Sequence, residues 1–124
     1  MKTYIVDTYA WIAYFEGNKK FLSEIEQNIL ETPSIVLAEL SKVLLVKKFD
    51  GKKMAEILDY VTESSIILEL GKEQAISAGQ ISAGEGLSLV DGIIYSYAAK
   101  DRQLLTGDKH FEKKPNANYI AAIR

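Results

Sequence analysis

Short apolar segments alternate with amphipathic segments along the whole chain. Residues 4–6 and 65–70 are short runs rich in apolar side chains, which is typical of buried strands. Residues 35–49 carry apolar side chains at helical spacing and end at an Asp-Gly pair, where a helix is expected to stop. The pattern predicts strands at 4–6, 65–70, 104–106 and 119–123. It predicts helices at 8–16, at 21–30 with room for a short strand at the end, and at 35–49 (with Pro33 fitting its first turn), 54–61, 75–81 and 88–100.

Strands that alternate with one or two helices favour parallel pairing, so the pattern predicts an α/β sandwich. Nothing in the sequence resembles a linker, a repeat or a low-complexity tract, and residues 1–124 are expected to form one domain. In open parallel sheets the functional crevice lies beyond the carboxyl ends of the strands. We therefore expect functional residues just after the predicted strands and at helix starts that face the same edge.

Composition narrows the classes of function. The chain has 124 residues and a net charge of -2, with no Cys and one His, which excludes thiolate sites and all-histidine metal sites. The charge argues against coating nucleic acid through bulk positive charge, but it leaves a nuclease open. No apolar run approaches the roughly 20 residues needed to span a bilayer, and no signal peptide is visible, so a cytoplasmic protein is expected.

Four carboxylates stand where chemistry would be expected. Asp7 and Asp108 closely follow predicted strands, and Glu39 and Asp91 lie in the N-terminal halves of predicted helices. Apolar neighbours would leave Glu39 partly desolvated, which is costly for an uncompensated carboxylate. Asp91 shares a helical face with side chains that look directed toward the core.

Each acid also has an ordinary structural explanation. Asp7 could cap the helix that follows it, and Asp91, three residues after Ser88, has the spacing of a capping box. Asp108 could be a turn residue, and Glu39 could be a solvent-facing acid. Taken one at a time, these residues leave both interpretations open.

Taken together, the four acids favour a cation site. Two like charges about 4 Å apart repel by roughly 4 kcal/mol at an effective dielectric of about 20. A cluster at one sheet edge therefore persists if protons or cations offset its charge. Oxygen ligands, in a chain without Cys, favour a hard cation such as Mg²⁺ or Mn²⁺.

Four segments in this order resemble the PIN domain family, and most closely the small PIN nucleases that act as toxins of VapBC toxin–antitoxin pairs. The segments are I-V-D-T at 5–8, V-L-A-E-L at 36–40, L-V-D-G-I-I-Y-S-Y-A at 89–98 and L-L-T-G-D-K-H-F at 104–111. The resemblance covers essentially the whole chain. It implies a three-layer sandwich with a central parallel sheet of four to five strands, and metal-dependent cleavage of RNA.

The resemblance also assigns roles to residues and partners. The family's acidic site carries over to Asp7, Glu39, Asp91 and Asp108, which would hold Mg²⁺ or Mn²⁺. The resemblance implies RNA as substrate, a homodimer, and a cognate antitoxin protein as partner.

Two hydroxyl side chains match positions of the family, and two other residues differ from its usual pattern. The hydroxyls of Thr8 and Thr106 match supporting positions and would hold carboxylates by hydrogen bonds. Tyr9 stands where the family often has a small polar residue. His110 lies at a variable position, so any supplementary acid is missing there and the number of metal ions stays open.

Basic residues near these motifs could contact RNA. Lys47, Lys48, Lys52 and Lys53 gather around a turn between two predicted helices, and Lys109 follows Asp108. They could bind phosphates or simply be solvated. Because thirteen of the fifteen basic residues are Lys, backbone contacts should dominate if nucleic acid binds.

The aromatic residues and the histidine have mainly structural explanations. We expect His110 to pack against Phe111 rather than to carry protons. We expect Trp11, Tyr14 and Phe15 to lie in the core or in a dimer interface rather than to stack on bases.

Other classes of protein also place acids beyond parallel strands. A phosphoryl-acceptor regulatory domain usually has adjacent acids after its first strand, whereas Asp7 is followed by Thr8, and Leu70-Gly71 offers no acceptor Asp. A haloacid-dehalogenase-type phosphatase would need an acid at position 9, which is Tyr9. A PIN-fold protein that binds RNA or a partner without cleavage remains an alternative.

Overall fold

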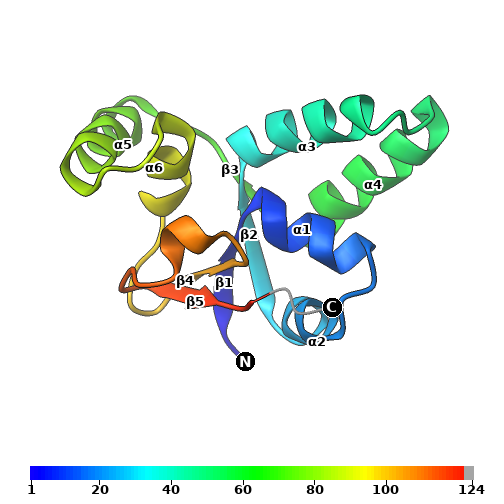
Figure 1. Cartoon of the computed structure of the whole chain (residues 1–124), viewed down its shortest axis with the longest axis horizontal. Helices are drawn as coiled ribbons and strands as arrows, with labels where there is room; N and C mark the ends of the chain where they lie inside the picture. The colour runs from blue at the N-terminus through cyan, green and yellow to red at the C-terminus, as the bar shows by residue number, and fades with distance from the viewer. Residues whose placement is uncertain (122–124) are drawn as a thin grey trace.

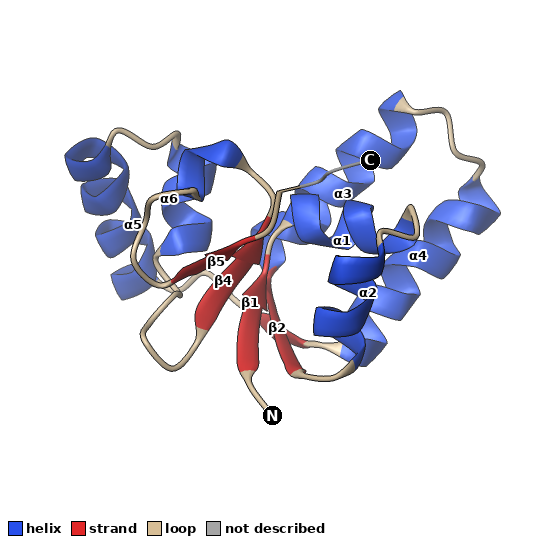
Figure 2. Ribbon diagram, turned by 60° about the horizontal axis from the view of Figure 1, so that its bottom comes forward, coloured by secondary structure: helices blue, strands red, loops and turns tan. Residues whose placement is uncertain are grey.

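The computed structural model describes residues 1–121, which form a parallel sheet between two layers of helices (Figures 1 and 2). The strands in this part of the chain are β1 (Thr3–Val6), β2 (Ile29–Pro33), β3 (Ile66–Leu68), β4 (Gln103–Thr106) and β5 (Ala117–Tyr119). The helices are α1 (Thr8–Phe15), α2 (Lys19–Glu26), α3 (Ser34–Val46), α4 (Gly51–Ser64), α5 (Lys72–Glu85) and α6 (Leu89–Tyr95), with a short 3-10 helix, η1 (Lys109–Phe111). The predicted α/β class, with three layers and a central parallel sheet of four to five strands, is confirmed.

The order of the strands creates a crevice at the centre of the sheet. The order is β3-β2-β1-β4-β5 and every pairing is parallel. Right-handed crossovers place α1 to α4 on one face and α5 and α6 on the other, as Figure 2 shows. The chain reverses its direction across the sheet between β1 and β4, so the carboxyl ends of these two strands flank the switch point where ligands bind in such folds.

Several predicted boundaries were wrong because pairing between strands overrode local periodicity. The helix predicted at 21–30 ends at Glu26, and the short strand for which the prediction left room is β2, whose Ile29 pairs with Thr3 of β1. Pro33 ends that strand instead of lying in the first turn of α3. In such a sheet a segment gains more from two neighbouring strands than from continuing an isolated helix.

The end of the chain also differs from the prediction. α6 stops at Tyr95 rather than Lys100, and residues 99 and 102 pair in a bridge that leads into β4. The last strand, predicted at 119–123, begins at Ala117 and ends at Tyr119. Residues 122 and 123 of that prediction lie outside the described part of the chain.

The core includes side chains of the sheet and of helices from both layers, and its largest buried side chain is Trp11 of α1. Trp11, Tyr4 and Phe21 are fully buried, and the indole Nε1 of Trp11 donates to Thr32 Oγ1 at 3.1 Å. Tyr14 and Tyr60 stack with ring centroids 5.6 Å apart beside the indole. Trp11 and Tyr14 are thus core residues, as predicted. Within residues 1–121, no helix has the length and apolar character to cross a bilayer.

Candidate active site

Asp7 lies at the centre of the carboxyl edge of the sheet, directly after β1. Val6 pairs with Leu105 of β4, so the residues that follow both strands emerge side by side. Asp7 caps α1, because its Oδ1 accepts a hydrogen bond from the backbone N–H of Ala10 at 2.8 Å. Its Oδ2 accepts one from the hydroxyl of Thr106. The carboxylate is only 3% exposed, so both oxygens are held in place away from solvent.

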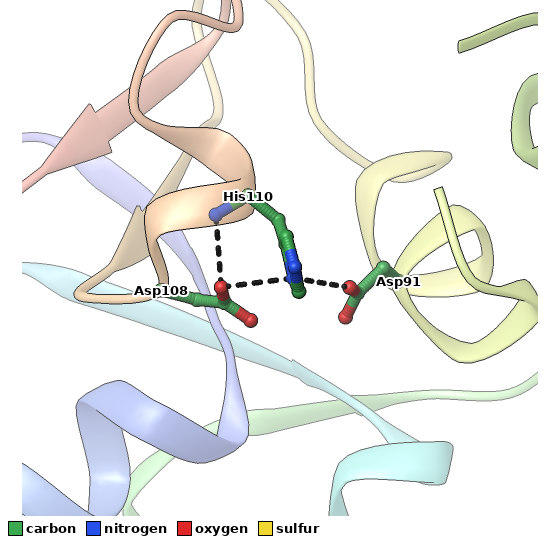
Figure 3. Close-up of side chains that lie close together, drawn as sticks. All are labelled: Asp91, Asp108 and His110. Atoms are coloured by element: carbon green, nitrogen blue, oxygen red, sulfur yellow. Dashed lines mark hydrogen bonds and ion pairs between the residues drawn. The ribbon is translucent and has the colours of Figure 1, made fainter. Parts of the chain in front are cut away.

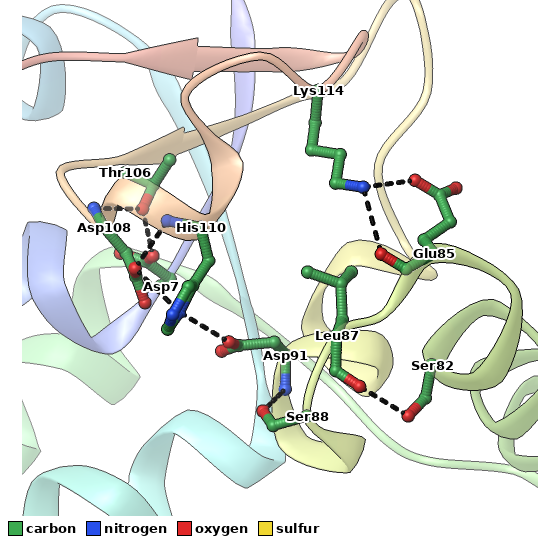
Figure 4. A network of polar contacts seen from close by, with 10 residues as sticks. All are labelled: Asp7, Ser82, Glu85, Leu87, Ser88, Asp91, Thr106, Asp108, His110 and Lys114. Atoms are coloured by element: carbon green, nitrogen blue, oxygen red, sulfur yellow. Dashed lines mark hydrogen bonds and ion pairs between the residues drawn. The ribbon is translucent and has the colours of Figure 1, made fainter.

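Thr106 connects the two acids that follow the central strands. Its hydroxyl oxygen donates to Asp7 and accepts from the backbone N–H of Asp108 at 3.0 Å (Figure 4). Asp108 in turn caps η1, since its Oδ1 accepts from the N–H of His110 at 2.9 Å. One buried hydroxyl therefore holds the carboxylate of Asp7 and the backbone of Asp108.

Asp91 reaches the same edge from the opposite helical layer. It lies in the first turn of α6, where the side chain of Ser88 accepts its backbone N–H at 3.1 Å. The next residue, Gly92, lies tight against α5: a Cβ there would be 2.9 Å from the carbonyl oxygen of Ala78 and 2.9 Å from the Cβ of Ser82. The absence of a side chain at Gly92 allows the close helix approach that positions Asp91.

His110 links Asp91 to Asp108 across the crevice, as Figure 3 shows. Its Nδ1 lies 3.1 Å from Asp108 Oδ1 and 3.4 Å from Asp91 Oδ2. The expectation that His110 packs against Phe111 was wrong. Phe111 is 1% exposed and contacts Tyr95, whereas the His110 side chain is 73% exposed and points toward the acids. Adjacent residues of a short helix face different directions, so His110 points away from the core that Phe111 enters.

We call Asp7, Asp91, Asp108 and His110 the acidic edge. Burial raises the pKa of Asp7 to about 7, and the charges of Asp108 and Asp91 add to this effect against the two hydrogen bonds that lower it. Burial and the charge of Asp108 likewise raise the pKa of Asp91. Burial is the largest cause for both carboxyl groups, and repulsion from the neighbouring carboxylates adds to it.

The donor set of the acidic edge fits a divalent cation. One donor atom from each of Asp91, Asp108 and His110 lies within 4.8 Å of the other two. Burial and the neighbouring carboxylates disfavour the ionised form of Asp7, and a bound cation would favour it. Oxygen-rich sites of this kind suit Mg²⁺ or Mn²⁺.

Glu39 approaches the edge from α3 but stands outside that group of three donors. It is partly buried, and its Oε1 accepts a hydrogen bond from the Thr8 hydroxyl at 2.6 Å. The hydrogen bond predicted for Thr8 is therefore present. It holds Glu39 beside the N-terminus of α1, one residue along the chain from Asp7.

Tyr9 fills the place next to Asp108 where a small residue was expected. Its ring lies on Gly107, so closely that a Cβ at Gly107 would be 2.3 Å from the ring atom Cε1. The ring also packs against Phe21, with centroids 6.3 Å apart. Tyr9 thus supports the loop between Thr106 and Asp108, and this explains why that loop has glycine at its centre.

The predicted basic residues divide into two places. Lys109 lies in η1, next to Asp108, and is exposed. The lysines of the α3–α4 turn lie at the opposite end of the long axis from α6, as Figure 1 shows. In that turn the Nζ of Lys47 is 3.7 Å from Glu16 and that of Lys53 is 4.0 Å from Glu56. The structure does not bring this cluster of Lys47, Lys48, Lys52 and Lys53 to the acidic edge.

Comparison with known proteins agrees with the fold. A doubly wound parallel sheet with carboxylates at its switch point defines a class of α/β proteins in which ligands bind at that edge. The family model described as "PIN domain" matches residues 4–117. The chain therefore belongs to the PIN domain family. A search of curated proteins found no match.

Solved structures of distant relatives share the whole architecture. VapBC2 from Rickettsia felis, bound to a DNA fragment from its promoter, aligns with a TM-score of 0.73 at 20% identity, covering 98% of this chain and 99% of that chain. DNA-bound VapBC from Salmonella typhimurium aligns with a TM-score of 0.75 at 18% identity, covering 98% of each chain. A toxin–antitoxin complex from Klebsiella pneumoniae aligns with a TM-score of 0.70 at 19% identity, covering 94% of this chain and 96% of that chain. At these identities the likeness concerns the fold.

Proposed function

We propose that this protein is a metal-dependent endoribonuclease that hydrolyses RNA phosphodiester bonds at the acidic edge. The observation that carries the proposal is the convergence of Asp7, Asp91 and Asp108 from three separate elements at the switch point of a PIN-domain sheet. Helix capping alone would not require these three carboxyl groups to lie together at one edge of the sheet. The raised pKa values of Asp7 and Asp91 are typical of a carboxylate cluster whose charge a cation would offset.

The protein's side chains would hold and orient the reacting groups. Asp7, Asp91 and Asp108 would hold the cation, directly or through water, and Glu39 would complete the cage or orient the attacking water. When bound, Mg²⁺ or Mn²⁺ lowers the pKa of a coordinated water and offsets charge on the phosphate. Thr106 and Thr8 keep the carboxylates of Asp7 and Glu39 in their rotamers, so little reorganisation accompanies the reaction.

RNA binding would rest on backbone contacts. Lys109 is placed next to Asp108, where its ammonium group can reach a phosphate near the scissile bond. We propose that the lysines of the α3–α4 turn contact only RNA that extends well beyond the acidic edge, because that turn lies at one end of the molecule, away from β1 and β4.

We further propose that the protein is the toxin of a toxin–antitoxin pair, with a homodimer as its own assembly in the cytoplasm. Support comes from the architecture shared with the VapBC complexes. A pocket between α1, α3 and α4, lined by Ile12, Phe15, Leu40 and Ile57, offers apolar surface to a partner. If the proposal is correct, production of the wild type arrests growth and production of Asp91→Asn does not. Equal growth with both proteins would contradict the toxin role.

Cleavage of a mixed RNA pool tests the enzymatic proposal directly. We expect cutting with Mg²⁺ or Mn²⁺, none with EDTA, and at least a 100-fold slower reaction in Asp91→Asn, since electrostatic stabilisation at the reacting centre is worth a few kcal/mol. The matched control is Asp59→Asn, an exposed acid on α4. Cutting that survives EDTA or Asp91→Asn would sink the proposal. If wild type fails to cut RNA but is stabilised by Mn²⁺, the PIN-fold RNA- or partner-binding alternative would gain support.

A further inference from the structure

His110 occupies a place that its own local structure does not require. Its backbone is fixed by η1, but its side chain is 73% exposed and could extend into solvent. The imidazole instead lies between Asp91 and Asp108, with Nδ1 toward both carboxylates (Figure 3). This orientation calls for an explanation beyond packing.

The distances around Nδ1 are those between neighbouring ligands of one cation. Ligands about 2.1 Å from a hexacoordinate ion and at right angles to each other lie roughly 3 Å apart. Nδ1 is 3.1 Å from Asp108 Oδ1 and 3.4 Å from Asp91 Oδ2. These three residues come from two elements, with Asp108 and His110 at η1 and Asp91 on α6, and each has a donor within 4.8 Å of the others. They can therefore face a single ion with little movement of the chain.

Resting on the proposed function, we propose that His110 is itself a ligand, through Nδ1, and that it makes this site select Mn²⁺ over Mg²⁺. Mg²⁺ keeps to oxygen donors and gives up water reluctantly. Mn²⁺ stands below the later transition metals in affinity for nitrogen, but it accepts an imidazole more readily than Mg²⁺ does. A nitrogen donor among carboxylates thus strengthens binding of Mn²⁺ while it adds little for Mg²⁺.

The sequence makes this proposal unusually direct to test. His110 is the only histidine in the chain, so a nitrogen hyperfine signal from a coordinated imidazole can have only one source in untagged protein. Pulsed EPR of the Mn²⁺-loaded protein should show ¹⁴N modulation in the wild type and lose it in His110→Ala. The side chain is exposed, so the variant should unfold at the same temperature as the wild type without metal.

Binding measurements give a second readout that does not depend on RNA cleavage. In His110→Ala, we expect Mn²⁺ to bind at least tenfold more weakly, the lower end of the loss seen even for outer-shell partners of metal ligands. Mg²⁺ affinity, measured by competition with Mn²⁺, should change by less than about twofold, because Mg²⁺ gains little from nitrogen. His110→Asp should reverse the preference and bind Mg²⁺ more tightly than the wild type does.

The outcomes separate this inference from the function on which it rests. If Mn²⁺ binds wild type and His110→Ala equally and without ¹⁴N modulation, His110 only forms an ion pair with the acids and the inference is wrong. The proposed function then stands if Mn²⁺ binding still depends on Asp91. If Mn²⁺ does not bind the wild type at all, both the inference and the metal-dependent function fail.

Discussion

Two regions of this protein are built on opposite principles. The aromatic cluster of Trp11, Tyr14, Phe15 and Tyr60 lies between α1 and α4, where rings stack and pack edge to face. The acidic edge gathers carboxyl groups whose burial and mutual repulsion make their ionised forms costly. The aromatic cluster increases the free energy of unfolding, and the acidic edge reduces it. A site that holds unbalanced charge can persist because the rest of the domain contributes enough burial to offset its cost.

Removing the centre of the aromatic cluster should have the largest effect on stability. Trp11→Ala leaves a cavity and removes the indole hydrogen bond to Thr32, so we expect a loss of about 3–5 kcal/mol in the free energy of unfolding. Urea denaturation followed by circular dichroism measures it. Trp11→Phe, which keeps much of the ring packing, should lose less. A loss below about 1 kcal/mol for Trp11→Ala would show that the cluster does not support the domain.

Removing charge from the acidic edge should stabilise the protein relative to the wild type at high pH, whereas Trp11→Ala destabilises it. The pKa of Asp7 is about 7 when folded and 3.8 ordinarily, so the folded protein binds the extra proton between these values. The stability contributed by the protonated carboxyl is complete below about pH 4 and is lost as the pH rises through 7. We expect the metal-free wild type to lose roughly 2 kcal/mol relative to Asp7→Asn between about pH 5 and pH 8.

Chemical denaturation in EDTA at the two pH values measures this difference. The same Asp7→Asn variant should lose most RNA cleavage while keeping its fold. Saturating Mn²⁺ should remove the pH dependence of the wild type, because a bound cation stabilises the ionised carboxylate. A stability difference that does not change with pH would show that the burial of Asp7 carries no electrostatic cost.

A tight helix contact allows a smaller and more selective perturbation of the acidic edge. Gly92→Ala forces α6 away from α5, so we expect a loss of about 1–3 kcal/mol and slower cleavage, because Asp91 moves with the helix. The matched control is Gly79→Ala on α5, where an added Cβ meets nothing within 4 Å. The control should gain up to about 1 kcal/mol from helix propensity. If Gly92→Ala and Gly79→Ala had equal effects, the close helix contact at Gly92 would not be what positions Asp91.

The smallest expected effect concerns the far end of the molecule. Replacing Lys47, Lys48, Lys52 and Lys53 by Ser should leave binding of a short RNA unchanged, because the α3–α4 turn is distant from the acidic edge. Binding of a long RNA should weaken, and the slope of its salt dependence should fall by up to about 0.7 for each phosphate that these lysines neutralise in the wild type. Lys109→Ser should weaken the binding of both the short and the long RNA. Filter binding at several salt concentrations distinguishes these outcomes, and unchanged long-RNA binding would leave the lysine cluster as solvated surface.

The acids show that structural and functional interpretations need not compete. Asp7 caps α1, as its ordinary explanation predicted, and Asp91 sits three residues after a capping serine. Asp108 was predicted only as a turn residue, and it caps η1. These caps fix each carboxylate at the start of a helix, and the helix starts are placed at one edge of the sheet. Capping is thus part of how the chain builds a charged site.

The order of elements, the parallel sheet and the candidate acids could be predicted from the sequence alone. These features are local: alternation of apolar runs reveals buried strands, and polar residues directly after them mark their carboxyl ends. Thr106 was identified through the resemblance to the PIN family, and its contact with the backbone of Asp108, two residues further on, is local.

Other features were decided by contacts between distant parts of the chain. Segment 29–33 is a strand because β1 and β3 lie on either side of it, although its own periodicity continued the preceding helix. His110 turns toward Asp91 because α6 stands across the crevice, and Asp7 is held by a hydroxyl 99 residues away. Such contacts depend on how elements pack, which local periodicity does not encode. The sequence determined which groups were available, and only the tertiary structure decided which of them meet.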